Sequence, residues 1–142
     1  MSLFKAYKTD QKLETEGVTF ELYDNRITMA RAGSTNPAFT AAMTKRTQPY
    51  RRQVARGELT PAKELEILRL VYADSIIQKW EVKRGEEWVE GIETSDGGVA
   101  QLTHDNVVKT LTELPDLFLE LQALASSAQN YRAEQLEADA GN

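Results

Sequence analysis

An apolar stripe that begins at Leu114-Pro115 is the strongest constraint on the fold of this chain. Proline suits the first turn of a helix, because its φ angle is fixed and it lacks the N–H that would have no partner there. Apolar residues then recur at helical spacing, as Leu114, Leu117, Phe118, Leu121, Leu124, Ala125 and Ala128. No reactive side chain lies on this stripe. We therefore expect a helix, continuing to about Leu136, that packs against protein.

The length of 142 residues and the hydrophobic content of 41% predict a single domain with a core of ordinary size. The sequence has no apolar run of about 18 residues and no apolar leader, so a soluble, intracellular protein is expected. It also has no cysteine, which excludes disulfides and thiolate metal sites. The expected parts are an extended arm (1–16), a β-hairpin (17–33), a helical region (36–136) and a frayed tail (137–142).

Alternating apolar and polar residues specify the β-hairpin. Phe20 and Leu22 alternate with polar residues before Asp24-Asn25, and Ile27 and Met29 do so after it. With Asp24-Asn25 as a two-residue turn, Leu22 faces Ile27 and Phe20 faces Met29, so that all four lie on one face. A lone hairpin is only marginally stable, and this face must therefore cover a helix or another chain.

Capping residues predict where the helices begin. Asn36-Pro37 and Thr60-Pro61 each place an N-cap before a proline, and Thr103 caps a short helix over 104–113. Pro49 interrupts the helix that starts at Asn36, and a second helical piece over 49–56 ends at a glycine, Gly57.

The helix that starts at Thr60 is expected to run for about 20 residues to Trp80. Apolar side chains reach most of the way round it, which indicates a central helix or one shared with a neighbouring subunit. Residues 82–102 predict only a loose hairpin or a long loop. Together these patterns predict an α+β fold, mainly α, in which the hairpin precedes a bundle of about four to five helices.

Residues suited to catalysis are scarce. The single histidine, His104, is followed by Asp105, but neighbours on a helix do not face each other. Both residues lie in the first turn after Thr103, where polar side chains serve as caps. The sequence has no phosphate-binding loop and no pair of histidines at metal-binding spacing. We expect no catalytic residue, no metal ligand and no cofactor, and hence no enzyme.

The charges are segregated along the chain. Between Gly33 and Gly57 there is no acid, and the basic residues there are Lys45, Arg46, Arg51, Arg52 and Arg56. This basic arm, Lys45 to Arg56, also holds Tyr50, and cations with an aromatic ring are typical of nucleic-acid grooves. The net charge of −5 argues against that interpretation, because nucleic-acid-binding domains are usually basic.

Self-association is the other interpretation of the basic arm. From residue 113 onward the chain is acidic, so a positive patch on one copy could meet the acidic tail of another. The predicted pairing joins Arg51, Arg52 and Arg56 to Glu134, Glu137 and Asp139.

Motifs spread over most of the chain resemble the tail assembly chaperones of long-tailed bacteriophages. In the second half these are Lys79-Trp80, Asp96-Gly97, Thr103 with Asn106, Leu114 to Phe118, and Ala125 with Asn130-Tyr131-Arg132. In the first half they are Gly17-Val18, the strand from Ile27 to Gly33, and Asn36-Pro37-Ala38-Phe39.

The resemblance implies a mainly helical protein of the infected host's cytoplasm, absent from the mature virion. Such a protein coats the tape measure protein, keeps it soluble and, through a frameshift-extended form, helps recruit the tail tube protein. It also implies a homo-oligomer, for which an open spiral is one expected form. The candidates for contact with the tape measure protein are Trp80, Leu117, Phe118 and Leu121. The alternative function is a nucleic-acid-binding phage accessory protein that uses the basic arm.

Overall fold

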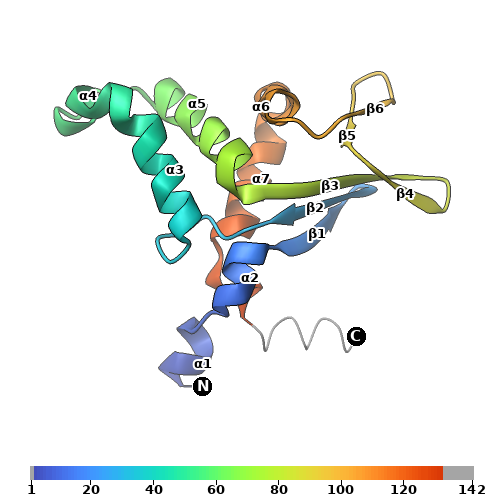
Figure 1. The fold of residues 1–142 in the computed structure, drawn as a ribbon, viewed down its shortest axis with the longest axis horizontal. Helices are drawn as coiled ribbons and strands as arrows, with labels where there is room; N and C mark the ends of the chain where they lie inside the picture. The colour runs from blue at the N-terminus through green and yellow to red at the C-terminus, as the bar shows by residue number, and fades with distance from the viewer. Residues whose placement is uncertain (1, 133–142) are drawn as a thin grey trace.

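The computed structural model describes residues 2–132 and shows an α+β fold that is mainly helical, as predicted (Figure 1). The helices are α1 (Leu3–Tyr7), α2 (Gln11–Glu16), α3 (Pro37–Thr47), α4 (Arg51–Ala55), α5 (Pro61–Val71), α6 (His104–Glu113) and α7 (Pro115–Ser126). Shorter helical turns are η1 (Gln48–Tyr50), η2 (Tyr72–Ile76) and η3 (Ala128–Tyr131). The strands are β1 (Val18–Leu22), β2 (Asn25–Met29), β3 (Ile77–Arg84), β4 (Glu87–Glu90), β5 (Ile92–Glu93) and β6 (Val99–Ala100).

The predicted helix starts are confirmed. The side-chain oxygens of Asn36, Thr60 and Thr103 accept backbone N–H groups in the first turns of α3, α5 and α6, at 3.2, 3.2 and 3.1 Å. Helix α6 spans the residues predicted for it, and Gly57, with φ of 66°, follows the end of α4. Helix starts can be predicted from the sequence because each capping side chain accepts backbone N–H groups of its own first turn and needs no distant residue.

Strands β1 to β4 form an antiparallel sheet in chain order, and β5 and β6 form a separate pair. The predicted hairpin exists, but its predicted turn and register are wrong. The turn residues are Tyr23 and Asp24, with φ of 46° and 62°, so that Phe20 pairs with Ile27. Positive φ at both positions is the requirement of a tight type I′ hairpin. Since the register moves by two residues, the apolar side chains still share one face.

The predicted helix from Thr60 to Trp80 is wrong in its second half. Helix α5 ends at Val71, one π turn follows, and the chain then enters strand β3, where Trp80 pairs with Ile27. Strand β2 therefore has a partner on each side. The apolar residues that suggested a helix buried all round belong to α5, η2 and β3. Tyr72, Ile76 and Ile77 lie in the main core, whereas Ile67 and Val71 pack with Ala42 of α3 in a second cluster.

Residues 2–16 do not form the extended arm that was expected over 1–16. They hold α1 and α2, and Asp10 caps α2 by accepting the N–H groups of Lys12 and Leu13 at 2.9 and 3.4 Å. The last helix also stops earlier than predicted, at Ser126, where the side-chain amide of Asn130 donates to the carbonyl of Leu124 at 3.0 Å. The rest of the predicted helix, 133–136, and the predicted frayed tail at 137–142 lie outside the described residues.

The predicted insert at 82–102 contains regular structure. Strands β3 and β4 form a hairpin whose turn holds Gly85 at φ of 65°, and β5 and β6 flank a turn at Asp96-Gly97. This hairpin extends away from helices α3 to α5 (Figure 1). The structure therefore confirms a hairpin in this insert, as the sequence predicted.

The main core lies between α7 and the strands β2 and β3. Its central members are Ile27, Met29, Tyr72, Trp80, Leu111, Phe118, Leu121 and Ala125. The rings of Tyr72 and Phe118 meet edge to face, with centroids 5.1 Å apart. This is the packing that the apolar stripe of α7 predicted, and its partner is the protein's own sheet.

Tyr131 ties the last described turn to the sheet. Its side chain is fully buried, and its hydroxyl donates to the carbonyl oxygen of Met29 at 2.9 Å, with that of Ala30 at 3.3 Å. Burial raises the pKa of this phenol far above its ordinary value.

We expect Tyr131→Phe to lower the free energy of unfolding by about 1 kcal/mol, because two buried carbonyls lose their hydroxyl donor while the ring remains. Urea unfolding followed by circular dichroism measures the change. Tyr7→Phe is the matched control, since the Tyr7 side chain is 73% exposed, and it should leave stability unchanged. Equal stability of the wild type and Tyr131→Phe would contradict this account of how the turn is held.

A buried carboxylate, Glu14, joins α2 to the segment after β2. It is 1% exposed, and it accepts hydrogen bonds from Thr35, from Arg31 at 2.9 Å and from Thr9 at 2.9 Å. Burial by itself raises the pKa of Glu14, but the hydrogen bonds from Thr35, Arg31 and Thr9 together outweigh it and leave the pKa below its ordinary value. The cluster therefore stabilises the fold while Glu14 is ionised.

We expect Glu14→Gln to lower the free energy of unfolding by about 1–3 kcal/mol at neutral pH. A lowered folded-state pKa means that this contribution is present above the unfolded-state pKa and is lost as the pH falls through the folded-state pKa. The difference between wild type and variant should therefore shrink below about pH 4. Urea unfolding over a pH series measures it, with Glu16→Gln on the exposed side of α2 as control. A stability difference between wild type and Glu14→Gln that did not change with pH would contradict a stabilising role for the ionised carboxylate.

Candidate interaction site

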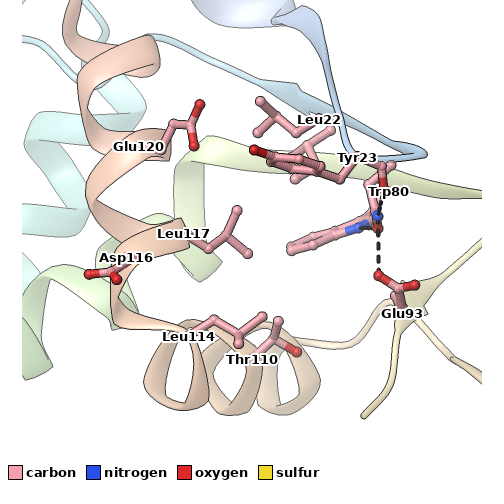
Figure 2. A pocket seen from close by; sticks show the side chains of 11 residues that line it. Leu22, Tyr23, Trp80, Glu93, Thr110, Leu114, Asp116, Leu117 and Glu120 are labelled. Carbon is pink, nitrogen blue, oxygen red and sulfur yellow. Dashed lines mark hydrogen bonds between the residues drawn. The ribbon is translucent and has the colours of Figure 1, made fainter. Parts of the chain in front are cut away.

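An apolar groove opens between the start of α7 and the turn that joins β1 to β2. Its volume is about 320 Å³, and α6 and β5 complete its walls. Figure 2 shows the side chain of Leu117 pointing into the opening toward the ring of Trp80, with Tyr23 and Leu114 at its edges. The walls thus combine the β1–β2 hairpin near the start of the chain with residues of β3, β5 and the consecutive helices α6 and α7.

The floor of the groove is fixed by the side chain of Asn25. The indole N–H of Trp80 donates to Asn25 Oδ1 at 2.9 Å, in buried surroundings. The amide nitrogen of Asn25 donates to the carbonyl of Tyr23 at 2.9 Å and to Glu93 Oε2 at 3.3 Å (Figure 2). Both ends of the amide are therefore satisfied, and the network connects the turn, β3 and β5.

The rim of the groove is acidic. Glu93, Asp116 and Glu120 are exposed there, and none of the residues that line the groove is basic. The guanidinium of Arg84 lies 3.8 Å from Oε1 of Glu93, outside the groove lining. An apolar middle with acidic edges favours a segment that presents apolar side chains flanked by lysine or arginine.

The four predicted contact residues fall into two groups. Trp80, Phe118 and Leu121 are 2%, 1% and 0% exposed and lie in the protein's own core. Trp80 also forms part of the groove lining, and Leu117, which is half-buried, reaches into the groove. Helical spacing identified the stripe, but it gives no sign of which members the sheet covers.

Sequence reasoning missed the other side of the groove. Leu22 and Tyr23 come from the hairpin, and Glu93 comes from a region interpreted as a loop. The available signal was Tyr23 itself, an aromatic residue in a turn, which is 93% exposed.

The basic arm is divided between a structural contact and an exposed helix. Arg46 contacts Asp74 through Nε at 2.6 Å and through Nη2 at 2.7 Å, and His104 Nε2 lies 2.8 Å from the same carboxylate. The hydrogen bond from Arg46 lowers the pKa of Asp74. This cluster joins α3, η2 and α6, whereas the side chain of Asp105 is fully exposed and lies 3.9 Å from His104.

Arg51, Arg52 and Arg56 are exposed on or just after α4, at one extremity of the molecule (Figure 1). The half-buried ring of Tyr50 has the ammonium of Lys63 at 5.1 Å from its centroid. The acids predicted to pair with these arginines, Glu134, Glu137 and Asp139, lie outside the described residues.

Within residues 2–132, no helix is long and apolar enough to cross a membrane. The same residues hold no group of three or more histidine, aspartate or glutamate side chains arranged for a metal ion.

A family model described as "YdaY prophage protein" matches residues 34–142. The match covers α3 through α7, and therefore the wall of the groove formed by α6, α7 and β5, but not the β1–β2 hairpin. A search of curated proteins and a search of solved structures each gave no match.

Proposed function

This chain belongs to the YdaY prophage protein family, and we propose that it acts as a tail assembly chaperone of a long-tailed bacteriophage. In this role it coats the tape measure protein in the host cytoplasm, keeps it soluble and helps recruit tail tube subunits. It is not expected in the mature virion. The family establishes the phage origin, and the resemblance of the motifs supports the finer assignment.

The acid-rimmed groove is the observation that carries the proposal. A tape measure protein is a long helical client, and apolar stripes on such a helix aggregate unless they are covered. A groove with Leu117 and Trp80 at its centre suits the helix-in-groove mode, in which one or two apolar side chains of the client enter a pocket. Binding of this kind needs shape and apolar area, and no bond is made or broken.

The size of the groove explains why many copies would be needed. A volume of about 320 Å³ holds only a few side chains, so that each contact with the client is weak by itself. Many weak contacts along one client provide strong and reversible coating, because each bound copy keeps the client within reach of the next site.

The alternative, a nucleic-acid-binding accessory protein, has less support from the basic arm. Arg46 is already paired with Asp74, and the ring of Tyr50 is half-buried beside Lys63. What is left for phosphates is Lys45 on α3 and three arginines on or just after the short helix α4, on a chain whose net charge is −5. We therefore place the chaperone first.

Co-expression with the tape measure protein tests the proposal. The wild-type chain should keep the client in the soluble fraction, and Leu114→Asp should reduce that fraction severalfold, because it places a charge on the apolar rim. Leu119→Asp is the matched control: both leucines are exposed, 50% and 61%, but Leu119 does not line the groove.

Circular dichroism of both variants establishes that each is folded. A client that stays insoluble with the wild-type chain, or that is rescued equally by both variants, would refute a chaperone role for this groove.

A further inference from the structure

Helix α1 displays an apolar face that nothing in the described residues covers. Leu3, Phe4 and Tyr7 are 74%, 78% and 73% exposed. Leu3 and Tyr7 are one helical turn apart and Phe4 is next to them, so the three side chains lie on one side of the helix. Such a cluster is typical of an interaction surface, because apolar side chains in contact with water are less favourable than the same side chains buried against a partner.

The face is held in a defined orientation. Arg132 Nη1 donates to the carbonyl oxygens of Lys5 and Ala6, at 3.0 Å each, and Ser2 caps the helix by accepting the N–H of Lys5 at 3.2 Å. The N–H of Asp10 donates to the carbonyl of Tyr131 at 2.8 Å just after the helix. Because these contacts order α1 in advance, a partner that binds it does not have to supply that ordering free energy.

The charges around α1 are complementary to those around the groove. Lys8 is exposed beside the apolar face, Lys5 is exposed on the other side of the same short helix, and the groove carries Asp116 and Glu120 on its rim. Helix α1 thus has both properties that the groove favours, namely apolar side chains and flanking cations.

The two surfaces cannot meet within one copy as the molecule is folded. The groove lies at the start of α7, and α1 contacts the turn that follows the end of α7 (Figure 1). The twelve residues of α7 separate the two by about 18 Å. To fill its own groove, α1 would have to give up its hydrogen bonds with Arg132.

We propose that α1 of one copy docks in the groove of a second copy, with Phe4 and its neighbours on the apolar middle and Lys8 against the acidic rim. The proposal rests on the proposed function for the role of the groove as a helix-binding surface, and it adds a regulation: α1 covers the groove until a client helix displaces it. Because the two surfaces differ, the contact is heterologous, and it repeats as an open chain or a closed ring.

Sedimentation velocity over a concentration series tests this docking with the full chain. The wild type should gain mass as its concentration rises, and Phe4→Asp and Leu114→Asp should each weaken association by about tenfold or more. Mixing the two variants gives the decisive result. Phe4→Asp keeps an intact groove and Leu114→Asp keeps an intact α1, so the mixture should form a one-to-one dimer that cannot extend.

A charge exchange covers the case in which Leu114→Asp fails to fold. Glu120→Lys should weaken self-association, and adding Lys8→Glu to it should restore part of the loss. Leu119→Asp, outside the groove, should associate like the wild type.

A wild type that remains monomeric, a Phe4→Asp variant that associates normally, or a variant mixture without a dimer would each overturn the docking of α1. None of these measurements contains the client. If the docking fails, Phe4→Asp and wild type can still solubilise the tape measure protein, and if the chaperone role fails, the variant mixture still forms its dimer. The two failures are therefore distinguishable.

Discussion

The hydrogen bond between the indole of Trp80 and the side chain of Asn25 is the contact on which the groove and its hairpin depend. A buried indole N–H without an acceptor costs stability, and Asn25 provides the acceptor at 2.9 Å. To do so, Asn25 must lie in strand β2 with its side chain toward β3. The turn then falls on Tyr23 and Asp24, both at positive φ, and the exposed ring of Tyr23 is placed at the edge of the groove.

This dependence also explains why the hairpin was predicted with the wrong turn. Asp24-Asn25 is the better turn by local preference, since both residues tolerate positive φ more easily than tyrosine does. The position of the turn is instead set by the contact of Asn25 with Trp80, which lies more than fifty positions away in the chain. The same reason applies to Trp80: helical spacing continues through it, but β2 needs a partner on its second edge, and residues 77–84 supply it.

Features that depend on one turn of backbone could be predicted, and those that depend on distant pairing could not. The caps at Asn36, Thr60 and Thr103 and the stripe of α7 are local, and the structure has them as the sequence indicated. Of the site, Leu114 and Leu117 lie on that stripe, and Leu117 and Trp80 are the predicted contact residues that line the groove. The opposite wall depends on how the hairpin and β5 pack against α7, which no periodicity encodes.

The arrangement of apolar surface suggests how one small chain could be both a stable protein and a coat for another. The middle of the α7 stripe, Phe118, Leu121 and Ala125, is buried in the protein's own core. Two uncovered apolar surfaces stand out in the described residues, the groove at the start of α7 and the face of α1 beyond its end. Each is small, and a contact through either alone is weak. Weak contacts of opposite charge at the two ends of one helix favour repeated, reversible assembly along a long client over a tight complex with one partner.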